Sequence, residues 1–227
     1  MNESSETPGQ CPWADQSATT STPSAAGSAA AAPSDRFGHR NYVLKKQFLK
    51  VFGGTFRIYD TNGNLLFFSK KKAFKLKEDI RLWSGEDMSQ EILSIKARKM
   101  LDISATYDVV DTASGQTVGA LRRKGLKSML QDEWAILDTQ DREMGTIKED
   151  STALALIRRF IDMASLLIPQ SFHGTIGNNP VCIFKQNANP FLARIDVDFS
   201  ADSNNLLDRR LGIAALVLMC AIEGKQR

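Results

Sequence analysis

Hydrophobic and polar residues alternate in short runs over much of residues 42–199, and turn-forming residues separate the runs. In the segment FRIYDTNGNLLFFS, residues 60–64 lie between two apolar runs, which is typical of a β-hairpin. The same arrangement recurs around residues 111–116 and 138–143, and each of the three turns begins with Asp-Thr. An aspartate at that position can accept hydrogen bonds from backbone N–H groups two residues on. About 12 strand candidates of this kind predict a barrel or a sandwich.

The C-terminal stretch LGIAALVLMCAI, residues 211–222, contains no charged residue and is bounded by Arg210 and Glu223. It is too short for a membrane span, which needs about 20 apolar residues. A helix that is apolar on every side is buried on every side. We therefore expect a closed antiparallel barrel of about 12 strands around a core helix, with a membrane segment as the alternative. The expected core positions of this helix are Leu211, Ile213, Leu216, Leu218 and Ile222.

A second helix is predicted over residues 151–168, within the segment DSTALALIRRFIDMASLLIPQ. Ser151 or Thr152 can cap its first turn, and Pro169 ends it. Its apolar positions cover most of the helical wheel, and its few charged residues form a narrow strip. We expect an amphipathic helix that lies on the barrel, or alternatively on a membrane surface.

The first 38 residues differ in composition from the rest and are predicted to form a tail, followed by one barrel domain over residues 39–227. Residues 1–35 are rich in Ser, Thr, Ala, Pro and Gly, which indicates disorder. They have neither the basic nor the apolar region of a secretory signal. The three cysteines, Cys11, Cys182 and Cys220, fit no disulfide framework and no zinc spacing, so we expect reduced thiols in the cytoplasm.

The formal net charge of +3 conceals an uneven distribution along the chain. Residues 1–35 contain four of the 26 acidic residues and no Lys or Arg, so residues 36–227 carry 29 basic and 22 acidic side chains. An excess of positive charge attracts phosphate groups. A single lysine can, however, also be a solvated side chain that keeps the edge of a strand from pairing. The candidate lipid- or anion-binding residues are Lys45, Lys46, Lys70, Lys71, Lys72, Lys75, Lys77, Arg122, Arg123 and Lys124.

Several segments taken in order resemble the tubby-like barrel superfamily, and in particular its bacterial LURP-one-related and phospholipid-scramblase-like branch. They are YVLKKQF, FRIYDTNGNLLFFSKKKAFKLKEDIRLW, ILSIKARKMLDISATYDVVD, LIPQSF, NPFLARIDVDFS and LDRRLGIAALVLMCAIEG. The resemblance covers residues 42–226 and implies a barrel of 12 strands around an apolar C-terminal helix. It implies phosphoinositide binding as in tubby proteins, or lipid movement as proposed for scramblases. For the LURP-one-related branch it implies no settled activity.

Scramblases place an acidic calcium-binding segment just before the terminal helix, where this chain has DVDFSADSNNLLD. Asp196, Asp198 and Asp202 are therefore the calcium candidates. An EF-hand pattern from Asp196 requires Gly at position 201 and Glu at position 207, but the chain has Ala201 and Leu207. Asp196 and Asp198 also fall on the outward face of the predicted strand. We predict no metal site here, and the chain lacks the cysteine-rich palmitoylation segment of animal scramblases.

The sequence contains no recognisable catalytic centre. Its two histidines, His39 and His173, lie in unrelated contexts, and no Ser or Cys occupies a nucleophile elbow. The segment FGGTF has no following helix and no Lys-Ser/Thr pair, so it is not a phosphate-binding loop. We expect neither an enzyme nor a cofactor.

The favoured function is a non-enzymatic binding module that recognises anionic lipid head groups through its basic residues. We expect it in the cytoplasm, free or peripheral at the inner membrane surface, with anionic phospholipid as the partner. One alternative is a scramblase-like protein with the C-terminal helix inserted in a membrane. A second is a nucleic-acid-associated or regulatory protein, for which exposed stacking aromatics are scarce. The sequence identifies no protein partner.

Overall fold

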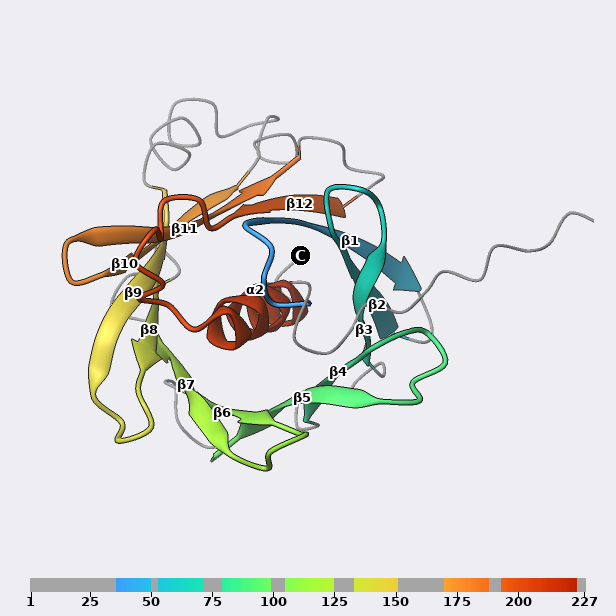
Figure 1. Ribbon diagram of the computed structural model, residues 1–227, viewed down its shortest axis with the longest axis horizontal. Helices are drawn as coiled ribbons and strands as arrows, with labels where there is room; N and C mark the ends of the chain where they lie inside the picture. The colour runs from blue at the N-terminus through green and yellow to red at the C-terminus, as the bar shows by residue number, and fades with distance from the viewer. Residues whose placement is uncertain are drawn as a thin grey trace, which may run out of the picture.

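The computed structural model describes residues 36–49, 53–71, 79–98, 105–124, 133–150, 170–187 and 193–223. In these residues, twelve β-strands close into a barrel and the helix α2 runs through its interior (Figure 1). The strands are β1 (Asn41–Leu49), β2 (Gly53–Tyr59), β3 (Leu65–Lys71), β4 (Ile80–Trp83), β5 (Glu91–Ala97), β6 (Thr106–Asp111), β7 (Thr117–Lys124), β8 (Glu133–Leu137), β9 (Glu143–Glu149), β10 (Ser171–Ile176), β11 (Asn179–Gln186) and β12 (Ala193–Asp198), and α2 spans Arg209–Glu223.

Neighbouring strands are antiparallel all the way round, and β12 closes the barrel against β1, with Tyr42 opposite Val197. The predicted fold, a closed antiparallel barrel of 12 strands around the C-terminal helix, is confirmed. The predicted helix over residues 151–168 lies outside the described residues, as do residues 1–35 of the predicted tail.

The three Asp-Thr turns are held as the sequence predicts, by the carboxylate of the leading aspartate. Asp60 Oδ1 accepts from the backbone N–H of Asn62 at 2.9 Å, and Asp111 Oδ1 accepts from that of Ala113 at 3.0 Å. Asp138 Oδ1 accepts from Gln140 N–H at 2.8 Å. Each carboxylate also accepts from a second backbone N–H of its turn, which fixes the strands on either side.

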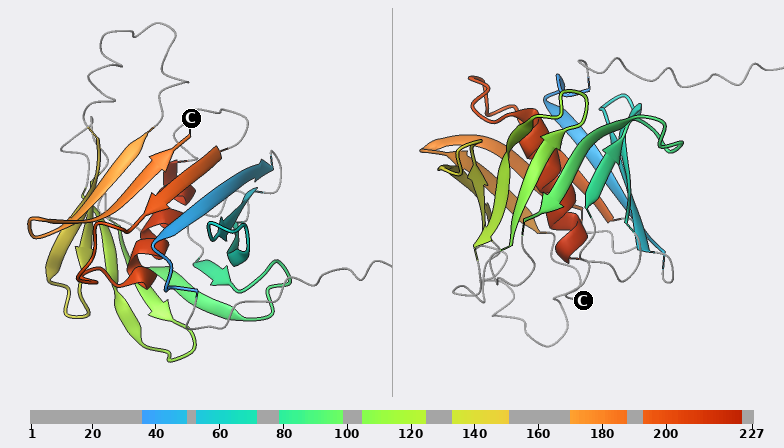
Figure 2. Two further views of the ribbon diagram at one scale, coloured as in Figure 1. Left: turned by 45° about the horizontal axis from the view of Figure 1, so that its top comes forward. Right: turned by 90° about the horizontal axis from the view of Figure 1, so that it is seen from below.

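The two ends of the barrel differ. The turns over residues 60–64, 84–90, 111–116, 138–142 and 177–178 all lie at the end where β1 begins and α2 starts, which we call the turn end. At the opposite end, where α2 finishes, the connections between strands lie outside the described residues. Figure 2 shows α2 threading from one end to the other.

The interior is built around α2, in which every residue from Leu211 to Ala221 except Gly212 belongs to the buried core. Aromatic side chains from several strands fill the space beside it, among them Tyr42, Phe56, Phe67, Phe184 and Phe199. Burying this apolar surface supplies the main driving force for folding. Of the helices in the described residues, none combines the length and the apolar character that a membrane crossing requires.

Small residues let α2 approach the wall closely. A Cβ on Gly119 of β7 would lie 2.5 Å from Leu137 O and 3.1 Å from Leu211 Cδ1. A Cβ on Gly212 would lie 2.6 Å from the ring of Phe199. Both glycines are therefore required by close packing, which explains why a glycine occurs within an otherwise apolar helix.

Among the described residues, the seam between β3 and β4 has the fewest paired residues of the barrel, with the single pair Phe68 and Trp83. Arg36 bridges this seam from inside: its Nη1 donates to Leu66 O at 2.6 Å and to Ser84 O at 3.1 Å. Its side chain is buried, and desolvation lowers the pKa of its guanidinium. Arg36 was predicted to belong to the tail of residues 1–38. In the structure it instead connects β3 to the segment that follows β4.

Candidate anion-binding wall of the barrel

The ten predicted anion-binding residues are not all on one surface. Lys72, Lys75 and Lys77 lie outside the described residues, and the Lys71 side chain does too, although its backbone ends β3. The remaining six divide into three groups. Arg122 and Lys124 are in ion pairs, Lys46 and Arg123 face the interior, and Lys45 and Lys70 are exposed.

Arg122 and Lys124 belong to a network of opposite charges on the outer face of β7, β8 and β9. Lys124 Nζ lies 2.5 Å from Glu143 and 3.1 Å from Glu133, and Arg122 lies 3.4 Å from Glu143. The hydrogen bond to Glu143 raises the pKa of Lys124. The carboxylates already neutralise much of this positive charge, so these two residues contribute little to attraction of an outside anion.

Lys46 and Arg123 lie on the inner side of the wall. Lys46 Nζ donates to the carbonyl oxygen of Cys220 in α2 at 2.5 Å and lies 5.7 Å from the centroid of the Phe56 ring. Arg123 pairs in register with Trp134, which is buried. Residues directly opposite on antiparallel strands share a face, so Arg123 faces inward like Trp134.

Lys45 belongs to a row of three cations across adjacent strands. It lies directly opposite Arg194 of β12 on one side and directly opposite Arg57 of β2 on the other. All three project from the outer face, because the inward positions of β1 are the buried Tyr42 and Leu44. Like charges that face each other across strands destabilise a sheet. Arg57 and Arg194 each pair with a carboxylate, so Lys45 is the member of this row whose charge has no described carboxylate partner.

Neighbouring groups hold the flanking arginines in place. Arg57 makes two parallel hydrogen bonds to Glu86, from Nε at 2.7 Å and from Nη2 at 3.0 Å. This hydrogen bonding raises the pKa of Arg57 and lowers that of Glu86. Arg194 lies 2.8 Å from Asp196. Lys45 Nζ lies 4.7 Å from the centroid of the Tyr59 ring, a cation–π contact that leaves its charge uncompensated.

Two further lysines extend the row along the circumference. Lys185 on β11 and Lys70 on β3 are exposed and form no ion pair with a described residue, although Lys185 lies directly opposite Asp196 of β12. Five adjacent strands, β11, β12, β1, β2 and β3, thus carry one outward basic residue each. We call this surface the basic wall, and its residues are Lys185, Arg194, Lys45, Arg57 and Lys70.

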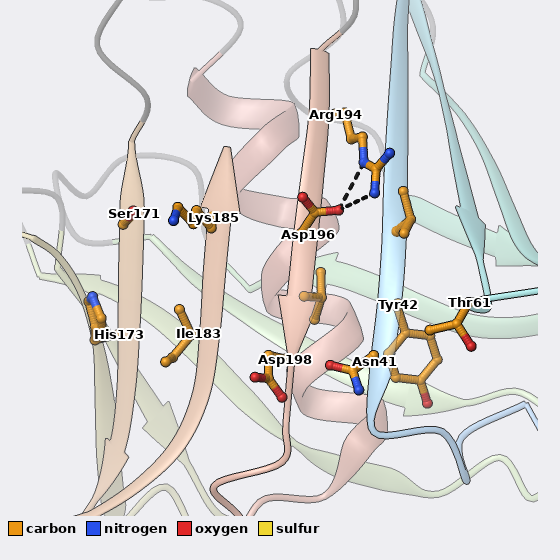
Figure 3. A pocket seen from close by; sticks show the side chains of 12 residues that line it. Asn41, Tyr42, Thr61, Ser171, His173, Ile183, Lys185, Arg194, Asp196 and Asp198 are labelled. Carbon is orange, nitrogen blue, oxygen red and sulfur yellow. Dashed lines mark hydrogen bonds and ion pairs between the residues drawn. The ribbon is translucent and has the colours of Figure 1, made fainter. Parts of the chain in front are cut away.

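A groove with a volume of about 670 Å³ borders the basic wall on the outer face of β10, β11, β12 and β1. Figure 3 shows Arg194 and Lys185 at one end of it, with Asp198 and Asn41 at the other. Val43 and Ile183 give part of its floor an apolar character. The surface of the wall is therefore hollowed here, and Arg194, Asp196 and Lys185 lie together at one end of the groove.

The three calcium candidates do not converge on one point. Asp196 is exposed and paired with Arg194, and Asp198 accepts from Ser200 N–H at 2.7 Å. Asp202 is buried, and its carboxylate accepts from the backbone N–H groups of Leu206 and Leu207 at 2.8 and 3.1 Å. Arg209 lies 3.3 Å from it. Asp202 thus shapes the loop that leads into α2.

The histidines and cysteines of the described residues show no catalytic arrangement. His173 lies on the outer face of β10, 3.7 Å from Asp150, and His39 stacks edge-on against Tyr42 at 5.7 Å. Burial raises the pKa of Cys182 to about 12, so its thiolate is scarce at neutral pH. Within the part of the chain that is described, no group of three or more His, Cys, Asp or Glu side chains could hold a metal ion.

Sequence reasoning named Lys45 and Lys70 of the basic wall and missed Arg57, Lys185 and Arg194. The alternation of β2, β11 and β12 places these three on outward faces, which was readable from the sequence. Their grouping was not, because it depends on the register between β12 and β1, whose residues are about 150 positions apart.

A closed antiparallel barrel around an apolar helix is the architecture of the tubby-like barrel superfamily. The profile of the LURP-one-related family matches residues 67–220, so the chain belongs to that family. Among solved structures, the X-ray structure of a protein from Arabidopsis thaliana is similar, with 14% sequence identity, a TM-score of 0.47, and an alignment that covers 88% of this chain and 100% of that one. A comparison with curated proteins gave no match. The family and the fold fit a binding module without catalysis of its own.

Proposed function

We propose that the basic wall docks the barrel reversibly on anionic lipid head groups. The observation that carries this proposal is the presence of three exposed lysines, Lys45, Lys70 and Lys185, on the outer face of neighbouring strands, none of them in an ion pair with a described residue. Each basic residue near an anionic membrane surface contributes about 1 kcal/mol. Several acting together suffice for reversible docking without any inserted segment.

The position of the wall fixes how the protein lies on a membrane. The basic side chains lie on the outer face of five adjacent strands, so the barrel axis runs roughly parallel to the bilayer when the wall faces it. The long stems of Lys45, Lys70 and Lys185 let their charged ends reach the phosphate layer. This arrangement supports a protein that stays on the cytoplasmic side and docks peripherally at the inner surface of the membrane.

The geometry favours docking over the two alternatives. A scramblase-like role with an inserted helix requires α2 to leave the barrel, although Leu216 and Leu218 are almost wholly buried there. Nucleic-acid binding relies on exposed aromatic rings for stacking. Beside the row, Tyr59 already carries Lys45 over its ring, and the buried Phe68 carries Arg57.

Co-sedimentation with vesicles tests the proposal. The protein is mixed at low salt with vesicles of phosphatidylcholine alone, or of phosphatidylcholine with phosphatidylserine, and a parallel sample contains duplex DNA as competitor. We expect sedimentation only with the acidic vesicles, and its loss at high salt, because exposed charges are screened. Equal binding to both vesicle types contradicts the proposal, and preferential binding to DNA supports the nucleic-acid alternative instead.

A further inference from the structure

The first 35 residues and the basic wall have opposite charge. The N-terminal segment contains Glu3, Glu6, Asp15 and Asp35 and no Lys or Arg. On the wall, Lys45, Lys70 and Lys185 have no described carboxylate within ion-pair distance. We infer that residues 1–35 dock on the basic wall of the same molecule and compete there with anionic lipid, an inference that rests on the proposed function.

The place where this segment joins the barrel brings it close to the wall. Arg36 is anchored by its side chain at the seam between β3 and β4, and its carbonyl oxygen accepts from the hydroxyl group of Tyr42 at 3.2 Å. β1 starts five residues after Arg36, and Lys45 follows four residues into that strand, about 13 Å further on.

The length of the segment is ample for the contact. A chain of 35 residues spans at most about 115 Å when fully extended. From its attachment at Arg36, the segment can therefore reach every residue of the basic wall. These residues lie on β1 and on the two strands to either side of β1.

Tethering makes a weak attraction sufficient. Charges separated by more than about 10 Å are largely screened at 0.1 M salt, so only close approach of the acidic residues to the lysines is effective. A covalent tether holds such a segment at an effective concentration on the order of millimolar. Intramolecular docking with an intrinsic Kd below about 1 mM then occupies the wall for most of the time. We expect the affinity for acidic vesicles to be about threefold to tenfold lower than that of the uncovered wall.

The regulatory consequence follows from competition. A membrane with few acidic lipids cannot displace the segment, whereas a strongly acidic surface offers many more charges and displaces it. The segment would thus set a threshold of surface charge above which the barrel docks.

A spin label on Cys11 tests the contact directly in the full-length protein. Cys182 and Cys220 are 1% and 2% exposed, so a thiol reagent under native conditions selects Cys11. We expect paramagnetic broadening of the backbone amide signals of Lys45, Arg57 and Arg194 at low salt, and its disappearance at high salt. The amide of Lys96, an exposed lysine on β5, serves as the control.

Two outcomes of this labelling experiment overturn the inference. One is an absence of broadening at the wall, or equal broadening at Lys96. The other is broadening only in a mixture of labelled and separately isotope-labelled molecules, which shows that the segment docks on a second copy.

A vesicle measurement with a charge-neutral N-terminal segment tests the competition. In the full chain, the changes are Glu3→Gln, Glu6→Gln, Asp15→Asn and Asp35→Asn, and the matched control is Gln10→Asn with Gln16→Asn. We expect the neutralised variant to bind acidic vesicles about threefold to tenfold more tightly than the wild type, and the control to bind like the wild type. Unchanged affinity of the neutralised variant overturns the competition. If neither the wild type nor the neutralised variant binds acidic vesicles, the proposed function fails. The spin-label result alone then decides whether the segment docks.

Discussion

The ammonium group of Lys46 lies 2.5 Å from the carbonyl oxygen of Cys220, three residues before the end of α2. The last carbonyl groups of a helix have no partner within the helix, and the helix dipole favours a positive charge there. The last turn of α2 contains no basic residue of its own. The first strand of the barrel therefore supplies the charge that the C-terminal helix lacks.

Replacing Lys46 by Met should lower the free energy of unfolding by about 1–2 kcal/mol, because a charge-assisted hydrogen bond and a dipole interaction are lost. The matched control is Lys45→Met, one residue earlier on the outer face, which should change it by less than about 0.5 kcal/mol. Urea unfolding curves of both variants measure the difference. Equal effects of the two substitutions would show that the interior contact does not stabilise α2.

Asp111 couples a barrel turn to the start of α2, since its Oδ2 accepts from Arg210 Nη1 at 2.8 Å. Burial alone would raise the pKa of Asp111, but the hydrogen bond from Arg210 and those of the turn lower it overall. A carboxylate with a lowered pKa stabilises the fold above its ordinary pKa of about 4, and this contribution is lost as the pH falls through the folded value.

The substitution Asp111→Asn should therefore cost about 1 kcal/mol at pH 7, while its amide oxygen still holds the turn. The difference from the wild type should shrink below about pH 4 and vanish near pH 2. Denaturant unfolding at several pH values checks this. A constant difference over that range would mean that the ion pair with Arg210 is not its source.

The strand pattern and the turns could be predicted from the sequence because they depend on neighbouring residues. Asp60, Asp111 and Asp138 hold their turns through local hydrogen bonds, and alternation identified the strands. The buried position of α2 followed from its composition, since a helix that is apolar on all sides needs a surrounding wall.

The candidate site was harder to predict because it depends on pairing between distant strands. Sequence reasoning listed both Lys45 and Lys46 as anion-binding candidates, whereas the structure shows that Lys45 faces outward beside Arg194 and Arg57 and that Lys46 faces the interior. The role of Arg36 was also beyond sequence reasoning, since its two acceptors are backbone carbonyls of Leu66 and Ser84.

An aspartate in the middle of α2 should prevent folding. Leu216 and Leu218 are 1% and 0% exposed, and a buried charge without a partner costs several kcal/mol. Expression of Leu216→Asp or Leu218→Asp should give insoluble or unfolded protein, as judged by the soluble fraction and by circular dichroism. A soluble variant with the melting temperature of the wild type would place the helix outside the barrel.

Removing the guanidinium of Arg36 should weaken the seam between β3 and β4. In Arg36→Met, the carbonyl groups of Leu66 and Ser84 lose their donor, at a cost of about 1–3 kcal/mol. Hydrogen exchange is measured in the wild type and in the variant. The substitution should accelerate the exchange of backbone amides in β3 and β4 more than that in β8 and β9. Uniform acceleration around the barrel would indicate a general loss of stability rather than a role at the seam.

The most direct test of the central claim compares two double substitutions that remove the same charge from different sides of the barrel. Lys45→Gln with Lys70→Gln changes the basic wall, and Lys96→Gln with Lys148→Gln changes exposed lysines on β5 and β9. Binding to phosphatidylserine-containing vesicles is measured for both variants at one low salt concentration. Docking through the wall predicts a loss of about 2 kcal/mol, or roughly 30-fold in affinity, for the first variant and little change for the second. Equal losses in the two variants would contradict the account, because they would mean that net charge rather than the wall determines binding.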